Sequence, residues 1–243
     1  MEMSFEMMQI GSKKWRNLIY EGAKQLDIQI DKHNIDKFTT HALELLKWNQ
    51  KTNLTAITDP VEVAIKHFLD SIVPVKIIPP NASLLDIGSG GGFPGIPLKI
   101  SLPHLSVTLI DASRKKVSFL KHMIRILELE NIEALHIRSE EFAETLDVAK
   151  TFNVVISRAL SSMTSFALAA RPFLKKDGVI IAMKGSVSNY DIQLLRSSIN
   201  KKHDMLMDKN TDEFEINVKR YSLPFLESNR SIVSLTYCNT LAH

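Results

Sequence analysis

The stretch SLLDIGSGGGFPGIP, residues 83–97, decides the fold and narrows the range of functions. A short apolar run reaches Asp86, and five glycines and two prolines follow it closely. A buried strand that passes through glycines into a helix near Gly95 or Pro97 places backbone N–H groups at the carboxyl end of a sheet, where open α/β folds bind ligands. Glycine suits this position because some residues need a positive φ and others must lack a Cβ where a ligand approaches. The stretch therefore predicts a ligand-binding loop.

The chain after this stretch has the pattern of a parallel sheet. Short β-rich runs lie near residues 84, 106, 132, 153 and 179, and amphipathic stretches such as Arg114–Leu129 separate them. This alternation predicts a doubly wound α/β sheet with crossover helices. The last two runs, Glu213–Leu223 and Ser231–Tyr237, have no long helix between them, so we expect them to add an antiparallel pair at the sheet edge and to bring the sheet to seven strands.

The chain before this stretch is expected to be helical. From Lys13 to Val73 the apolar residues recur at helical spacing, and Asp59 followed by Pro60 is typical of an N-cap and a first-turn proline. We therefore expect an N-terminal helical extension at residues 1–80 and a ligand-binding domain at residues 81–243.

The glycine loop fits two kinds of ligand. Gly90, Gly92 and Gly95 match the G-x-G-x-x-G pattern of dinucleotide-binding folds, and Asp111 ends the next strand about where a ribose-binding acid belongs. This interpretation predicts an NAD-dependent oxidoreductase. Asp111 would accept hydrogen bonds from the ribose hydroxyls of either ligand, so it does not distinguish them.

The acid before the glycines favours the other ligand. Gly88, Gly90 and Gly92 also form an acid-x-G-x-G-x-G turn, in which we expect Asp86 at the rim of the crevice. A carboxylate there would repel the pyrophosphate of a dinucleotide and attract the ammonium and sulfonium groups of S-adenosylmethionine. The alternative is that Asp86 caps the turn and the glycines merely make it tight.

Composition sets wider limits. The net charge of +3 and the sequence pI of about 8.8 permit nucleic-acid binding but do not require it. Cys238 is the one cysteine, which excludes an internal disulfide and a multi-cysteine metal site. The N-terminus is not typical of a secretory signal, and no run of about eighteen apolar residues occurs. We therefore expect a soluble cytoplasmic protein, monomeric and not bound to a membrane.

Four segments carry a resemblance to a known family. The loop LLDIGSGGGFPGIPL, the upstream KWNQKTNLTAITDPVEVAIKHFLDSI, and the downstream RSEEF and VVISRA resemble the methyltransferase G family, also called glucose-inhibited division protein B. The likeness runs from about Lys32 to Val233. It implies a Rossmann-like class I methyltransferase fold, S-adenosylmethionine as donor, and transfer to guanine N7 of 16S ribosomal RNA in the small subunit, near the decoding site.

The resemblance also implies the donor site. Gly88 and Phe93 would line it, Ser139 and Glu140 would hold the adenine end, and Arg158 would close the pocket. Phe93 either stacks against the adenine or plugs the junction of helix and sheet. The physical argument for the loop adds four residues: Asp86, Gly90, Gly92 and Asp111.

Several residues are expected to contact RNA. Arg114, Lys115 and Lys116 begin the helix after the second strand, at the sheet edge that carries the donor loop, and are expected to form an electropositive rim. Asn53 and Lys184 follow predicted element ends and are further candidates; a turn former and a solvated lysine are the alternatives. A non-catalytic RNA-binding or assembly factor with the same pocket remains a third class of function.

Methylation of guanine N7 needs no general base, because N7 already presents a lone pair. Orientation of the two reactants is then the main requirement. His67 and Asp70 are three residues apart and could share a helix face. We interpret them as structural support for the glycine loop, with a catalytic pair as the alternative. The sequence has no metal-ligand spacing of histidines, so no metal is expected.

Overall fold

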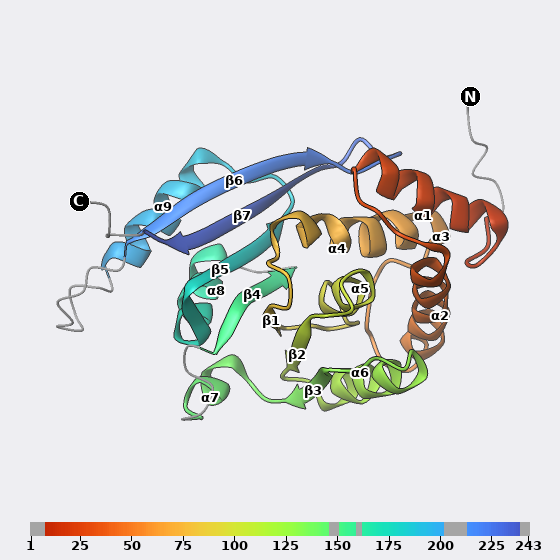
Figure 1. The fold of residues 1–243 in the computed structure, drawn as a ribbon, viewed down its shortest axis with the longest axis horizontal. Coiled ribbons are helices and arrows are strands. Elements are labelled where there is room, and N and C mark those ends of the chain that lie inside the picture. Colours follow the sequence, from red (N-terminus) through yellow and green to blue (C-terminus); the bar gives the residue numbers. More distant parts are fainter. Residues whose placement is uncertain (1–7, 146–150, 159–161, 202–212, 239–243) are drawn as a thin grey trace.

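The computed structural model describes residues 8–145, 151–158, 162–201 and 213–238. It has a seven-stranded sheet in the order β3-β2-β1-β4-β5-β7-β6 (Figure 1). The strands are β1 (Ser83–Ile87), β2 (Ser106–Asp111), β3 (Ile132–His136), β4 (Phe152–Arg158), β5 (Leu174–Lys184), β6 (Phe214–Ser222) and β7 (Asn229–Tyr237). The first five are parallel, and β7 runs antiparallel between β5 and β6. The predicted doubly wound sheet with an antiparallel pair at its edge is confirmed.

Helices precede the sheet and cover it. They are α1 (Lys13–Gln25), α2 (Lys32–Asn49), α3 (Pro60–Glu62), the π-helix η1 (Val63–Leu69), α4 (Asp70–Ile72), the 3₁₀ turn η2 (Val73–Ile77), α5 (Gly95–Ser101), α6 (Arg114–Ile126), α7 (Ser139–Ala143), α8 (Met163–Ala170), the 3₁₀ turn η4 (Arg171–Phe173) and α9 (Asn189–Lys201). The predicted start at Asp59 is confirmed, because its side chain accepts the backbone N–H of Glu62 at 2.9 Å. No helix within the described ranges is long and apolar enough to cross a membrane.

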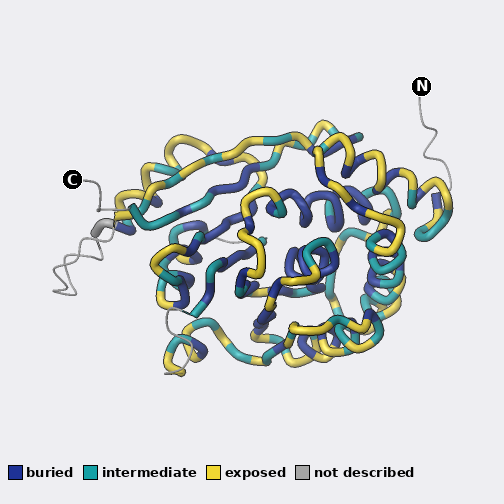
Figure 2. Tube along the Cα trace, in the orientation of Figure 1, coloured by how far each residue is buried: buried dark blue, intermediate teal, exposed yellow. Residues whose placement is uncertain are grey.

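Each face of the sheet has its own hydrophobic cluster. Neighbouring β1 residues point to opposite faces, so Leu84 joins one cluster and Leu85 the other. The Leu84 cluster holds Trp15, Phe38 and Phe68 of the N-terminal helices together with side chains of the sheet. Figure 2 shows the buried residues on the central strands and on the inner sides of the helices. The N-terminal helices and the sheet therefore share a core, and the division at residue 80 stays a prediction.

The strand order reverses between β1 and β4. From β1 the chain continues through β2 to β3 and then returns to the other side of β1, so that β1 pairs with both β2 and β4. In doubly wound folds the crevice for ligands lies at this reversal, at the carboxyl ends of the strands. Asp86 of β1 and Arg158 of β4 are near these ends.

Candidate functional site

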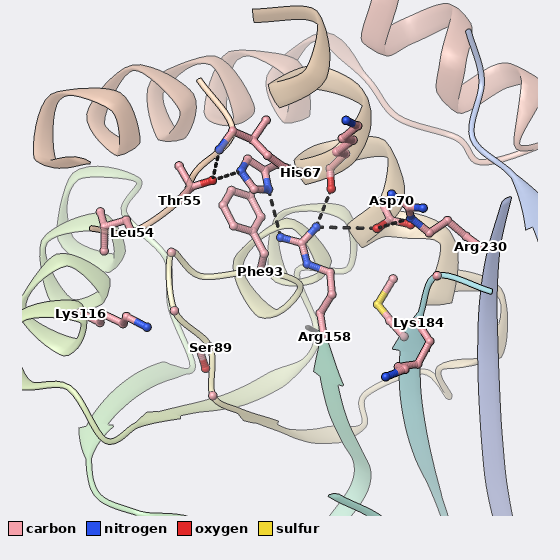
Figure 3. A pocket seen from close by; sticks show the side chains of 17 residues that line it. Leu54, Thr55, His67, Asp70, Ser89, Phe93, Lys116, Arg158, Lys184 and Arg230 are labelled. Atoms are coloured by element: carbon pink, nitrogen blue, oxygen red, sulfur yellow. Dashed lines mark hydrogen bonds and ion pairs between the residues drawn. The ribbon is translucent and has the colours of Figure 1, made fainter. Parts of the chain in front are cut away.

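A cleft of about 640 Å³ opens at this position (Figure 3). Its walls come from the glycine loop after β1, from the segment that contains Leu54 and Thr55, from η1 and α4, and from the ends of β4 and β5. Lys116 of α6 and Arg230 of β7 complete the lining. The cleft thus joins the N-terminal segment, the parallel strands and the C-terminal hairpin.

The glycines of the loop have two different roles: some leave open space in the cleft and others allow close packing in the core. Gly88 and Gly90 line the cleft with φ values of +73° and +56°. A Cβ on Gly88 would meet nothing within 4 Å, and one on Gly90 would meet only the carbonyl oxygen of Gly88, at 3.9 Å. Gly92 also has a positive φ but faces the core, where a Cβ would lie 2.5 Å from Ile96 Cδ1. Gly92 is therefore needed for packing and is not among the cleft-lining residues.

Asp86 does not lie at the rim of the crevice, so this expectation was wrong. It is fully buried beneath the loop, where Oδ2 accepts the backbone N–H of Gly95 at 2.9 Å. This contact forms because β1 directs the side chain toward the start of α5, and Gly95 lacks the Cβ that would lie 2.8 Å from Oδ2. Asp86 Oδ1 is buried and has no hydrogen-bond partner. Burial raises the pKa of Asp86 to about 7.

Asp111 holds the loop from the next strand. Its Oδ2 accepts the backbone N–H of Gly90 at 3.0 Å, and its Oδ1 accepts that of Ser113 at 2.8 Å. The side chain is buried and is not part of the cleft lining. Asp111 thus fixes the glycine loop and the residue before α6.

Ser139 and Glu140 lie apart from the cleft. They begin α7, which follows β3, and neither belongs to the cleft lining. Ser139 is half-buried and Glu140 is exposed. Of the donor-site residues taken from the resemblance, the cleft therefore brings together Gly88, Phe93 and Arg158 but not these two.

Arg158 is the central cation of the cleft. Its Nη1 donates to the carbonyl oxygen of Lys66 at 2.6 Å, and its Nη2 donates to Nδ1 of His67 at 3.1 Å. Nη1 also lies 3.8 Å from Asp70 Oδ2. The guanidinium is 5.0 Å from the ring centroid of Phe93. The end of β4 is in this way tied to η1 and to the glycine loop.

His67 is a neutral side chain that links Arg158 to Thr55 by hydrogen bonds. Because Arg158 donates to Nδ1, the ring proton is on Nε2, which donates to Thr55 Oγ1 at 2.8 Å. Burial, with a further contribution from Arg158, lowers the pKa of His67 to about 3. His67 and Asp70 share Arg158 as a partner. Their arrangement agrees with the structural interpretation of the pair.

Phe93 is stacked between two imidazoles. The ring centroids lie 4.4 Å from His67 and 4.7 Å from His41, with interplanar angles of 10° and 9°. His41 is fully buried, and its Nε2 donates to the carbonyl oxygen of Gly91 at 2.8 Å. Since both faces of Phe93 are covered, the structure agrees with the packing alternative for this ring and not with stacking on adenine.

The contribution of the C-terminal hairpin to the cleft was not predicted from the sequence. Tyr221 of β6 donates its hydroxyl proton to Asp70 Oδ1 at 2.7 Å. Nε of Arg230 lies 3.7 Å from Asp70 Oδ2. No local signal marks these residues or His41, because each acts through a partner far away in the chain. Thr55, the hydrogen-bond partner of His67, was not predicted either, although the neighbouring Asn53 of the same NLT segment was a candidate.

The predicted RNA-contacting residues are spread around the cleft. Lys116 and Lys184 line it, whereas Arg114 and Lys115 are exposed just outside on α6. Asn53 is exposed beside Leu54, which lines the cleft. Within the described residues no group of three or more histidine, cysteine, aspartate or glutamate side chains is arranged to hold a metal ion.

Solved structures resemble this fold at low sequence identity. A SAM dependent methyltransferase from Aquifex aeolicus matches with a TM-score of 0.54 and 14% identity over 80% of this chain and 97% of that chain. M. jannaschii TYW2, solved in complex with AdoMet, matches with a TM-score of 0.50 and 15% identity over 86% of this chain and 78% of that chain. These similarities show a Rossmann-like methyltransferase fold.

Sequence relatives identify the family. The family model for rRNA small subunit methyltransferase G matches residues 34–217. A protein of that name from Geobacter sulfurreducens is 37% identical over 221 residues, which is 91% of this chain and 97% of the relative. Another from Geotalea uraniireducens is 46% identical over 170 residues, 70% of this chain and 77% of the relative. Together with the fold and the glycine-loop cleft, these matches show that the chain belongs to the rRNA small subunit methyltransferase G family.

Proposed function

We propose that this protein transfers a methyl group from S-adenosylmethionine to N7 of a guanine in the decoding-site region of 16S ribosomal RNA. The observation that carries the proposal is the glycine loop, whose open backbone at Gly88 and Gly90 lies at the strand reversal above the buried Asp86. Membership of the rRNA small subunit methyltransferase G family supports the reaction and the class of RNA.

The residues of the loop fit a cationic donor. The empty space beside Gly88 admits a ligand against the backbone, and Asp86 Oδ1 has no partner in the described protein. A cation near the loop would favour the ionised form of Asp86, whose pKa is otherwise raised to about 7. Asp86 then attracts the donor through the loop and not from the rim. A diphosphate in the same place would meet repulsion, which argues against the NAD-dependent oxidoreductase alternative.

The side chains of the cleft position the reactants and do not remove a proton. When bound, S-adenosylmethionine supplies an electrophilic methyl group on a positively charged sulfur. Guanine N7 offers its lone pair directly, so the chain has to hold the base in line with the methyl group, an effect worth up to roughly 7–11 kcal/mol. His67 is neutral and both ring nitrogens have partners, so it is occupied as a structural group. The carboxylates of Asp70 and Asp86 would favour the positive charge that the purine gains.

Several broader predictions accompany this function. We propose that the N-terminal extension of residues 1–80, of which the structure describes residues 8–80, completes the cleft, since η1 and the Leu54–Thr55 segment line it. The protein is further proposed to act in the cytoplasm as a monomer without a metal ion. Size-exclusion chromatography and elemental analysis of the purified protein test the last two points.

A methylation assay tests the proposal. Purified protein is incubated with methyl-labelled donor and either protein-free 16S rRNA or intact small subunits, and the modified base is then mapped. We expect label at N7 of one guanine near the decoding site. Label on a different atom, or none on either substrate, would contradict the proposal. Calorimetry with S-adenosylmethionine and with NADH distinguishes the oxidoreductase, which would bind only the second ligand.

A further inference from the structure

A second, smaller groove continues the cleft across the C-terminal hairpin. It has a volume of about 380 Å³ and lies between the β6–β7 hairpin and the residues that follow β5. Arg230 lines both cavities, and the lining passes from Lys184 and Gly185 in the cleft to Ser186 and Val187 in the groove. A chain molecule that leaves the cleft past Arg230 would therefore enter this groove.

The groove has the chemistry of a phosphate-binding surface. Its lining includes two arginines, three serines and an asparagine, and the described lining contains no acid: Arg220, Arg230, Ser186, Ser222, Ser231 and Asn229. Guanidinium groups bind phosphate with two parallel N–H donors, and hydroxyl and amide groups add further donors. These groups suit a phosphodiester backbone.

The side chains of the two arginines differ in their hydrogen bonds and ion pairs. Arg230 Nη1 donates to Ser228 Oγ at 2.7 Å, and Arg230 Nε faces Asp70. The backbone of Arg220 is paired with Ser231 in the β6–β7 ladder, but its exposed side chain forms no hydrogen bond or ion pair with a residue in the described ranges. Its full set of donors is available to a ligand in the groove. Tyr221, the one aromatic residue of the described lining, has its hydroxyl committed to Asp70, which favours contact with the backbone over specific hydrogen bonding to a base.

We propose that this groove binds the phosphodiester backbone of the RNA strand next to the target nucleotide, with Arg220 as its principal phosphate ligand. The inference rests on the proposed function, because it assumes that the target base occupies the cleft. The groove sets the direction in which the strand leaves the cleft, toward the β6–β7 hairpin and away from Lys116 on α6.

Arg220→Gln tests the proposal, with Lys219→Gln as the matched control. Both residues are exposed on β6, and each substitution removes one positive charge, but Lys219 does not line the groove. We expect Arg220→Gln to weaken binding of protein-free 16S rRNA by about tenfold and to reduce the slope of log affinity against log salt by about 0.7, as for one lost phosphate contact on a single strand. Lys219→Gln should change both much less, and donor affinity should be unchanged in both variants.

A second variant blocks the groove from its other wall. Ser186→Asp places a negative charge there at an exposed position and should weaken RNA binding at least as much as Arg220→Gln. The groove proposal is overturned if both variants bind RNA like the wild type, or if they affect intact small subunits but not protein-free RNA, which would indicate a ribosomal protein as the partner.

The two proposals can fail separately. Wild-type protein that binds 16S rRNA but does not methylate it contradicts the proposed function, while the RNA affinities of the variants still decide on the groove. If Arg220→Gln methylates 16S rRNA at the wild-type rate, with the same KM for RNA and the same salt dependence of RNA binding, only the groove proposal is contradicted.

Discussion

The two carboxylate oxygens of Asp86 have different surroundings, and this allows its charge and its packing to be separated. Oδ2 accepts the N–H of Gly95, whereas Oδ1 has no partner. Asp86→Asn keeps an oxygen acceptor for Gly95 but removes the negative charge. We expect it to weaken S-adenosylmethionine binding by about tenfold in calorimetry, or roughly 1.4 kcal/mol, with the fold retained. Unchanged donor affinity in a folded variant would remove Asp86 from the donor site.

The buried acid also makes stability depend on pH. The pKa of Asp86 is raised from 3.8 to about 7, so between these pH values the unfolded chain loses a proton that the folded protein keeps. The free energy of unfolding should therefore fall as pH rises through this range, by at most about 1.4 kcal/mol per pH unit from this group. Urea denaturation at several pH values checks this. Asp86→Asn should show a flatter profile, and parallel profiles would contradict the assignment.

Arg158 tests the geometry of the cleft rather than its charge. Lysine keeps the positive charge but cannot bond Lys66 and His67 with one planar group. We expect Arg158→Lys to lower the free energy of unfolding by about 1–3 kcal/mol, and Arg158→Ala by about 3–5 kcal/mol because Asp70 then loses a buried countercharge. Arg114→Lys, at an exposed position on α6, is the control for both. Equal stability of Arg158→Lys and the control would show that the planar contacts are unimportant.

At the scale of elements, the junction between β1 and α5 depends on Gly95. A Cβ there would lie 2.4 Å from Leu109 Cδ2 and 2.8 Å from Asp86 Oδ2. Gly95→Ala should therefore destabilise the protein by about 1–3 kcal/mol through overpacking. Gly185→Ala serves as the control, because a Cβ at Gly185 meets nothing within 4 Å. Thermal denaturation of the two variants should differ clearly, and similar midpoints would contradict this account.

The strands and most helices were predictable because their signals are local. The apolar run at Leu84 and Leu85 predicts a strand buried on both faces, and these two residues do point to opposite faces of the sheet. Asp59 is followed directly by Pro60, which predicts the helix start that Asp59 caps. The π-helix η1 was not predicted, since its stability depends on distant contacts: Arg158, which bonds the carbonyl oxygen of Lys66, is 92 residues away.

The site was predictable only where the loop sequence itself carried the information. The glycines and their acid were found by pattern, but the depth of Asp86 depends on how β1 faces α5. The contacts of Asp70 were not foreseeable, because Tyr221 and Arg230 reach it through the pairing of β6 with β7 and of β7 with β5.

At the scale of the whole molecule, positive charge beside the cleft is expected to guide RNA. Arg114, Lys115 and Lys116 begin α6, and Lys116 lines the cleft. Reversing all three to glutamate should weaken binding of 16S rRNA and reduce its salt dependence, while donor affinity is unchanged.

A filter-binding titration over a range of salt concentrations measures this effect. The control is Lys175→Glu with Lys176→Glu, because these residues lie at the amino end of β5, at the opposite sheet edge from the cleft. Methylation of small subunits at the wild-type rate by the α6 variant would rule out a role for this rim.

The bond between Tyr221 and Asp70 has a consequence for the order of assembly during protein synthesis. The ribosome makes Asp70 151 residues before Tyr221, so the early helices must wait for their distant partner while the intervening polypeptide emerges. The cleft of a growing chain is therefore incomplete. It can form fully only late in translation, when the β6–β7 hairpin packs against the Asp70 segment that was made much earlier.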